Sequence, residues 1–255
     1  MTKLLKNSRR GFTAVELVVV IVVLVIVVTV TMVTVDKRRQ ARLRLESRIN
    51  LSGLWVVLAG EDTHDWMRLG PHPLLPPLST VPGQLAPQLN PEMLKTLEGL
   101  EDEATFVSPA HPDAERKRRV ALADPAASIN DESYWYLGYI IHSEEMGLAF
   151  VEAYKKAVME TGKPPTGNVI KVRPYDRGDG VMLDELFRLG KQVGSDYPRR
   201  YSSPILIERP GLQRGGSTVL YEAGMPYFRR YPRDWLMTEK FIKALESLDE
   251  LKVRN

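Results

Sequence analysis

The chain has 255 residues and no cysteine, so it can form no disulfide, no thiolate metal site and no cysteine nucleophile. Its 35 basic and 32 acidic residues nearly balance, and the basic residues do not gather in a stripe with interleaved aromatics, as nucleic-acid binding requires. The motifs G-x-S-x-G and H-E-x-x-H and a phosphate-binding glycine loop are missing. We therefore expect no nucleic-acid partner, no cofactor and no enzyme activity.

One long apolar run stands out instead. Residues 17–35 carry no charge, and eleven of them are valine and three threonine. Taken from residue 12, the segment would reach ~36 Å as a helix, enough to cross a hydrocarbon core of ~30 Å. In lipid the backbone must satisfy its own hydrogen bonds, which favours a helix. The run is too long for a cleaved secretory signal and has no small-x-small cleavage site after it, but an uncut signal anchor remains an alternative.

The charges beside this run do not settle its orientation. Lys3, Lys6, Arg9 and Arg10 precede it without an acidic residue, and residues 36–48 carry six basic and two acidic side chains. Both flanks are therefore net +4, and the positive-inside rule favours neither direction.

The start of the run, R-R-G-F-T-A-V-E-L-V-V-V-I, resembles the amino-terminal signal of type IV pilins and type II secretion pseudopilins. The resemblance implies that residues 1–11 are a leader, which a prepilin peptidase removes after Gly11 on the cytoplasmic side. Phe12 would then become the methylated amino terminus, and Glu16 would be the fifth mature residue. Residues 12–35 would cross the inner membrane once, with the remainder in the periplasm.

Glu16 is the one charged residue within this segment, where an ionisable group costs a few kcal/mol. In the pilin-like interpretation, Glu16 of one subunit pairs with the Phe12 amine of the next. Such a pair fixes the axial register, because a wrong register leaves a buried charge alone. The alternative is an interfacial glutamate without a partner. Loss of the leader removes four positive side chains and changes the formal charge from +3 to −1.

We expect residues 36–60 to continue the helix and residues 61–255 to form a globular head. The predicted fold class is α+β: a long amino-terminal helix packed on a head with helices and a small antiparallel sheet. Alternatively, the basic residues at the start of this segment, residues 37–48, rest on anionic lipid at the membrane surface instead of packing on the head. The apolar spacing predicts a stripe that packs on the head; its members are Leu43, Leu45, Ile49, Leu54 and Val57.

In the head, residues 70–91 carry seven prolines and are predicted to be an extended loop. Residues 91–103 are a short helix candidate, and residues 106–125 look like a loop with a solvated charge run. Residues 133–141 are predicted to be a strand. Ser143 is expected to cap a helix that ends near Glu160, with Met146, Phe150, Val151 and Tyr154 on its buried face.

Residues 203–232 are predicted to form a strand, a loop and a hairpin, whose strands, residues 217–221 and 225–229, flank a turn at residues 222–224. Thr238 is expected to cap a last helix with Phe241, Leu245, Leu248 and Leu251 buried. The hairpin resembles the segment G-G-x-V-L-Y-x-D-G-H-V-x-F, followed by Tyr-Pro, of large-headed bacterial pilin-like proteins. The matching residues are Gly215, Gly216, Val219, Leu220, Tyr221, Gly224, Phe228, Tyr231 and Pro232. The Asp-Gly-His core is replaced by Ala223, Gly224 and Met225, so its polar role is not expected here.

Candidate metal ligands are weak. Asp176 and Asp179 precede Gly180, and a head loop of major pseudopilins binds calcium, but the spacing departs from the EF-hand pattern. Four further candidates lie close together in the sequence: Glu61, Asp62, His64 and Asp65. Such adjacent polar residues are more typical of a solvated turn than of a metal site. The other histidines, His72, His111 and His142, are scattered.

These features predict a membrane-anchored structural subunit of a type IV pilus or type II secretion assembly. Its expected partners are the prepilin peptidase, other pilin or pseudopilin subunits and inner-membrane lipid. Two alternatives remain open: a periplasmic ligand-binding or enzymatic head that uses the signal only for export and anchoring, and a signal-anchored protein never cut at Gly11.

Overall fold

The computed structural model describes residues 13–59, 78–79, 87–89, 106–123, 133–176, 180–189 and 203–251. It shows a long amino-terminal helix and a head that combines helices with two small antiparallel sheets. The predicted α+β class is confirmed. The chain divides into two units, Met1–Arg42 and Leu43–Asn255, and helix α1, Ala14–Ala59, has residues in both.

The head is built on a four-stranded antiparallel sheet in the order β1-β4-β5-β6. Its strands are β1 (Tyr134–Tyr136), β4 (Pro204–Glu208), β5 (Gly216–Tyr221) and β6 (Pro226–Arg230). Every residue of β1, β4 and β5 is buried. Strands covered on both faces tend to be apolar throughout rather than alternating, and the run Ile205–Leu206–Ile207 fits this rule.

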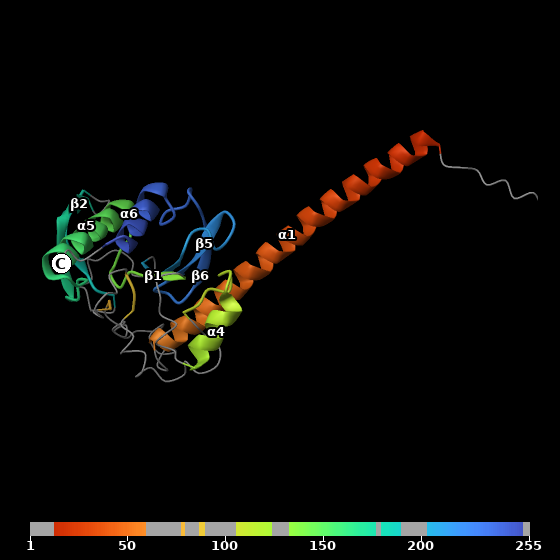
Figure 1. Cartoon of the computed structure of the whole chain (residues 1–255). Helices are drawn as coiled ribbons and strands as arrows, with labels where there is room; N and C mark the ends of the chain where they lie inside the picture. Colours follow the sequence, from red (N-terminus) through yellow and green to blue (C-terminus); the bar gives the residue numbers. More distant parts are fainter. Residues whose placement is uncertain are drawn as a thin grey trace, which may run out of the picture. The chain divides into compact units, whose positions relative to one another are not determined.

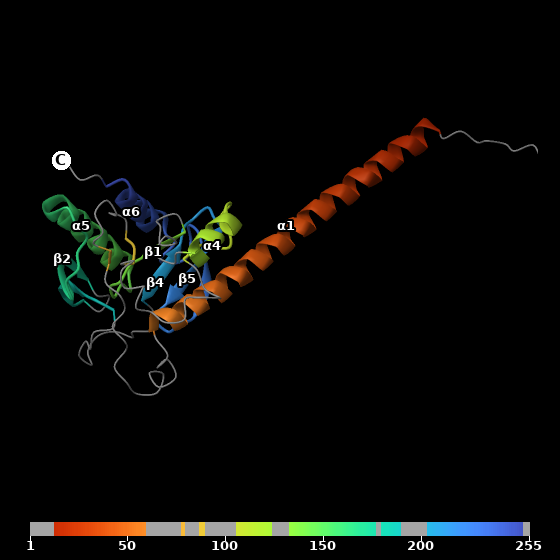
Figure 2. The same ribbon diagram turned by 60° about the horizontal axis from the view of Figure 1, so that its bottom comes forward.

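Two helical layers provide this cover (Figures 1 and 2). On one face, Asn50 of α1 donates a hydrogen bond to the Tyr134 hydroxyl at 3.1 Å. On the other, the Trp135 indole donates to Asp249, the last residue of α6 (Glu239–Asp249), at 3.2 Å. Neighbouring residues of a strand point to opposite faces, so β1 binds α1 and α6 through successive side chains.

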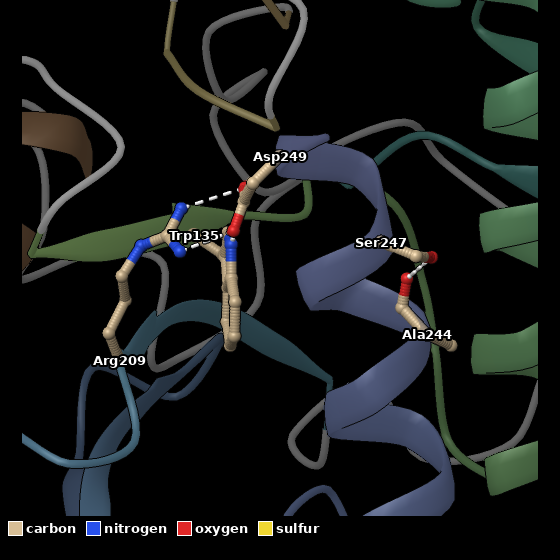
Figure 3. A network of polar contacts seen from close by, with 5 residues as sticks. All are labelled: Trp135, Arg209, Ala244, Ser247 and Asp249. Atoms are coloured by element: carbon tan, nitrogen blue, oxygen red, sulfur yellow. Dashed lines mark hydrogen bonds and ion pairs between the residues drawn. The ribbon is translucent and has the colours of Figure 1, made fainter. Parts of the chain in front are cut away.

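An ion pair strengthens the contact with α6 (Figure 3). The Arg209 guanidinium, directly after β4, makes two hydrogen bonds to the Asp249 carboxylate and lies 4.5 Å from the centre of a Trp135 ring. Both charged side chains are mostly shielded from solvent. This bidentate arrangement with a stacked indole fixes the end of α6 on the sheet.

The remaining elements extend this framework. Helix α5 (Glu144–Thr161) packs beside α6 and against a two-stranded sheet of β2 (Val169–Asp176) and β3 (Met182–Phe187). Ser143 caps α5 as predicted, and the four residues expected on its buried face are buried. Thr238 caps α6 as predicted, with Phe241, Leu245 and Leu248 buried and Leu251 partly buried.

Some element predictions are wrong. The strand expected over residues 133–141 has only the three residues of β1. Leu137 still donates to the Ile205 carbonyl at 3.1 Å, but the chain turns away at Gly138, which has φ +69°. Part of the loop expected over residues 106–125 is helix α4 (Ala114–Ala123). The β2–β3 hairpin was not predicted. The helix expected at residues 91–103 lies outside the described residues.

The predicted stripe on α1 is also partly wrong. Leu54 and Val57 are buried, but Leu45 and Ile49 are 58% and 61% exposed, and Leu43 is partly exposed. The face that packs on the head carries apolar residues at helical spacing, Leu51, Leu54, Trp55 and Leu58. Ser47 and Asn50 lie on the same face and hydrogen-bond to the sheet. The buried residues of α1 are Ser47, Asn50, Leu51, Leu54, Trp55, Val57 and Leu58.

Candidate functional site

The first half of α1 is exposed on every side. Its large apolar side chains from Val15 to Val35 are between 42% and 72% exposed, and none is covered by the protein. Among the described helices, α1 is the one that is long and apolar enough to span a membrane. Apolar side chains around the whole circumference are typical of a helix that an apolar medium surrounds.

The polar groups of this segment are satisfied within the helix. The hydroxyls of Thr29, Thr31 and Thr34 each donate to the backbone carbonyl four residues earlier, at 2.8, 2.7 and 2.8 Å. A hydroxyl bonded in this way needs no water and no second helix. The three threonines are therefore compatible with a lipid environment.

Glu16 closes the amino-terminal turn of α1. Its Oε2 accepts hydrogen bonds from the backbone N–H of Thr13 at 2.8 Å and the Thr13 hydroxyl at 2.9 Å. The Glu16 N–H in turn donates to the Thr13 hydroxyl at 3.2 Å. This is a reciprocal capping box, T-x-x-E. Sequence reasoning missed Thr13, although the three-residue spacing from Glu16 is its signal.

The two processing residues cannot be placed in the same way. Gly11 and Phe12 lie outside the described residues, so the contact proposed between Phe12 and Glu16 stays a prediction. Thr13 and Glu16 nevertheless show that the helix begins at Ala14, two residues beyond the first residue after the predicted cut.

The weak metal candidates gain no support. Asp176, the last residue of β2, accepts a hydrogen bond from the Gly180 N–H at 3.0 Å. Within the described residues, no three side chains of His, Asp or Glu lie together as metal ligands would. The other candidates lie outside those residues: Asp179, Glu61, Asp62, His64, Asp65 and His72.

The head does bring one serine and one histidine together. The Ser203 hydroxyl lies 3.3 Å from Nδ1 of His142, a pairing that nucleophilic catalysis also uses. Ser203 is fully buried, however, and burial lowers the pKa of His142 to about 4. A shielded hydroxyl beside a weakly basic imidazole favours a structural role for this pair.

His111 lies in a different part of the head, in the loop before α4. Its Nδ1 accepts a hydrogen bond from the Asp113 N–H at 3.0 Å.

No model of a known protein family matches the chain, and no curated protein and no solved structure shows a significant match. The pilin-like interpretation therefore depends on the residues around Gly11 and Glu16 and on the carboxyl-terminal hairpin. The structure itself shows a long apolar amino-terminal helix and a small α+β head.

Proposed function

We propose that the chain is a membrane-anchored, pilin-like structural subunit of a type IV pilus or type II secretion assembly. Prepilin peptidase removes residues 1–11, and residues 12–35 hold the subunit in the inner membrane until it assembles with its neighbours. The head remains in the periplasm. No cofactor takes part.

The observation that carries this proposal is the uniform exposure of the first half of α1, together with the sequence around Gly11. A fully exposed apolar helix is unstable in water, but it is stable in a bilayer or in a bundle of identical helices. The internally bonded hydroxyls of Thr29, Thr31 and Thr34 fit both environments.

The second half of α1 adds support for subunit packing. Leu45, Ile49 and Val56 are 58%, 61% and 55% exposed, and their spacing places them on one helical face. This face lies opposite Leu54 and Leu58, which pack on the head. An apolar stripe on the side away from the head favours contact with another subunit over contact with water.

Glu16 has two candidate roles that substitutions can separate. As a cap, it needs only an oxygen that accepts from Thr13, and glutamine supplies one. As a partner for a neighbour's Phe12 amine, it needs its negative charge. Glu16→Gln therefore keeps the cap and removes the charge, Thr13→Ala keeps the charge and weakens the cap, and Glu16→Leu removes both.

The experiment is crosslinking of neighbouring subunits through cysteines placed in residues 12–35 of this cysteine-free chain. If Glu16 pairs between subunits, Glu16→Gln and Glu16→Leu lose crosslinking or change its register, while Thr13→Ala keeps it. Membrane insertion of Glu16→Leu is retained or improved, because a costly polar group has been removed. If Glu16→Gln crosslinks like the parent, the charge is not used in assembly.

Processing is tested by the intact mass of the protein extracted from membranes of cells that contain the peptidase. The expected mass lacks residues 1–11 and carries one added methyl group. A bulky residue in place of Gly11 should block the cut. A full-length parent chain in such cells would contradict the pilin-like proposal and favour the uncut signal anchor.

A further inference from the structure

A carboxylate lies in the interior of the head, between α1 and the sheet. Oε1 of Glu208, the last residue of β4, contacts the hydroxyls of Ser47 at 3.0 Å and of Ser108 at closer range. Its Oε2 accepts from the Thr218 N–H at 3.1 Å and from the Gln213 side-chain amide. One side chain thus joins α1, the loop before α4, the β4–β5 turn and strand β5.

Each of these groups is shielded from water. Glu208, Ser47, Ser108 and Thr218 are 0% exposed and Gln213 is 2% exposed. The Gln213 amide also bonds the hydroxyls of Ser47 at 2.9 Å and Thr218 at 3.0 Å, so the five side chains form one network. Glu208 is the one member of this network that contacts all four structural elements.

No cation balances Glu208 among the described residues. Arg209, its neighbour in the chain, is bound to Asp249 on the other face of the sheet. On α1, the Arg44 guanidinium lies 3.9 Å from the centre of the Phe228 ring and donates to a backbone carbonyl. A buried ionised carboxylate without a cation is strongly disfavoured.

The other titratable and charged groups near the network are few. On β1, the Tyr134 hydroxyl lies close enough for electrostatic coupling to Glu208, and burial raises its pKa. Arg118 of α4 acts on Tyr134. The loop before α4 carries His111 and Asp113, which are hydrogen-bonded to one another. Strand β5 has no charged residue. Arg214, next to Gln213 in the β4–β5 turn, is exposed, and Glu46 of α1 is partly exposed.

The two oxygens of Glu208 differ in their partners. Oε2 faces the backbone N–H of Thr218, which can only donate, and the side-chain amide of Gln213. Oε1 faces only the hydroxyls of Ser47 and Ser108, and a hydroxyl can either donate or accept. A proton on Oε1 can therefore be donated to a serine oxygen once that hydroxyl has rotated its own hydrogen away, whereas a proton on Oε2 would oppose the Thr218 N–H.

We propose that Glu208 is a proton-controlled clasp between α1 and the head. With a proton on Oε1, the network is neutral and holds Ser47 of α1 and the loop at Ser108 against the sheet. When the proton leaves, an uncompensated charge remains in the interior, and the segment of α1 that contains Ser47 loosens. The network itself stands whether or not the protein assembles as a pilin-like subunit.

The direction of the pH effect follows from burial. Burial raises the pKa of the Glu208 carboxyl above its ordinary value of 4.5, so the folded protein retains a proton that the unfolded chain loses. The resulting stabilisation is fully present below pH 4.5 and is lost as pH rises through the folded-state pKa. His142 acts in the opposite direction, since its lowered pKa of about 4 reduces stability as pH falls below 6.5.

The test is hydrogen exchange of the full chain in lipid nanodiscs from pH 5 to 9, corrected for the intrinsic rates. In the parent, peptides from residues 43–58 should lose protection as pH rises, about tenfold for each pKa unit gained on folding. In Glu208→Gln this loss should be absent, because the amide stays neutral and can donate to the two serine hydroxyls. The control Glu185→Gln changes a partly exposed glutamate of β3 and should behave like the parent.

A second variant keeps the proposal testable if Glu208→Gln does not fold. Ser47→Ala removes one hydroxyl that stabilises the ionised carboxylate, so the midpoint of the protection loss should move to higher pH. The clasp is refuted if residues 43–58 keep the same protection across the pH range in the parent, if Glu208→Gln retains the parent's pH dependence, or if Ser47→Ala leaves the midpoint unchanged or lowers it.

Discussion

The two halves of α1 share one continuous helix but face different surroundings. In residues 14–35 every large apolar side chain is exposed, and the three threonine hydroxyls bond to their own helix. In residues 43–58 one face is buried, and two polar residues, Ser47 and Asn50, lie on it. Their hydrogen bonds go to Glu208 and Tyr134 of the sheet.

This difference shows that the two halves of the helix depend on different properties of their residues. The first half has no preferred face, so composition alone determines its compatibility with lipid. The second half is positioned by a few specific contacts, and a polar residue with a matching partner can lie in the interior while a leucine stays outside. Exchange of one apolar residue for another should therefore have little effect in the first half, whereas its effect in the second half should depend on the face.

The largest effect is expected from Leu54→Asp. Leu54 is 0% exposed in the core of the head, and an unpaired buried charge destabilises a domain by more than ~4 kcal/mol. The matched control is Ile49→Asp on the same helix, where the side chain is 61% exposed and the expected change is within ~0.5 kcal/mol. Thermal unfolding of the full chain in detergent measures both. Equal destabilisation by the two substitutions would mean that the buried face of α1 is misassigned.

Gly224→Ala should have the next largest effect. A methyl group there would lie 2.3 Å from the Trp55 indole nitrogen, and the backbone has φ +74°. We expect a loss of ~2–4 kcal/mol from overlap and backbone strain together. Gly211→Ala is the control, because its φ is +92° but nothing lies within 4 Å, so only strain of ~1–2 kcal/mol remains. Chemical denaturation compares the two variants, and similar losses would show that Trp55 does not require this glycine.

The fold was predictable from the sequence wherever one strong local signal decided it. Uninterrupted apolar character identified the first half of α1, and Ser143 with Gly162 defined both ends of α5. The failures have two causes, tertiary packing that overrides the local pattern and a local charge run that hides a helix. Leu45 and Ile49 fit a helical stripe, but the face that packs on the head carries Leu51, Leu54 and Leu58 together with Ser47 and Asn50. Four consecutive basic residues obscured α4, which the charge run made look like a solvated loop.

The candidate sites also fall into two groups, one that local sequence spacing indicates and one that only the packed structure reveals. Glu16 attracted attention as a charge in an apolar run, and its partner Thr13 lies only three residues away. Ser47, Ser108 and Glu208 are separated by 61 and 100 positions along the chain, and none of them belongs to a short motif. Only the packing of α1 on the sheet brings these groups together, so no reading of local spacing could have found the network.

Asn50→Leu tests whether a polar contact positions the second half of α1, and its expected loss of unfolding free energy is smaller than that of Gly224→Ala. Leucine has a similar shape, but it leaves the buried Tyr134 hydroxyl without the donor that now lies 3.1 Å away. We expect a loss of ~1–3 kcal/mol, the usual consequence of an unsatisfied buried polar group. Unfolding of the full chain measures it, with Ile49→Leu on the exposed face as the control. A more stable Asn50→Leu variant would show that apolar packing, not the Tyr134 contact, positions this half of α1.

Thr29→Val should have the smallest effect. Valine is nearly isosteric with threonine and removes only the hydroxyl that donates to the Val25 carbonyl at 2.8 Å. That carbonyl still accepts its ordinary helical N–H, so no polar group is left unsatisfied. The change in membrane insertion, measured by a glycosylation-based insertion assay, should stay within ~0.5 kcal/mol. Crosslinking through cysteines in residues 12–35 should keep its register. If Thr29→Val retained insertion but altered the register, the Thr29 hydroxyl would have to contact a neighbouring subunit, and the first half of α1 would then have a specific face like the second.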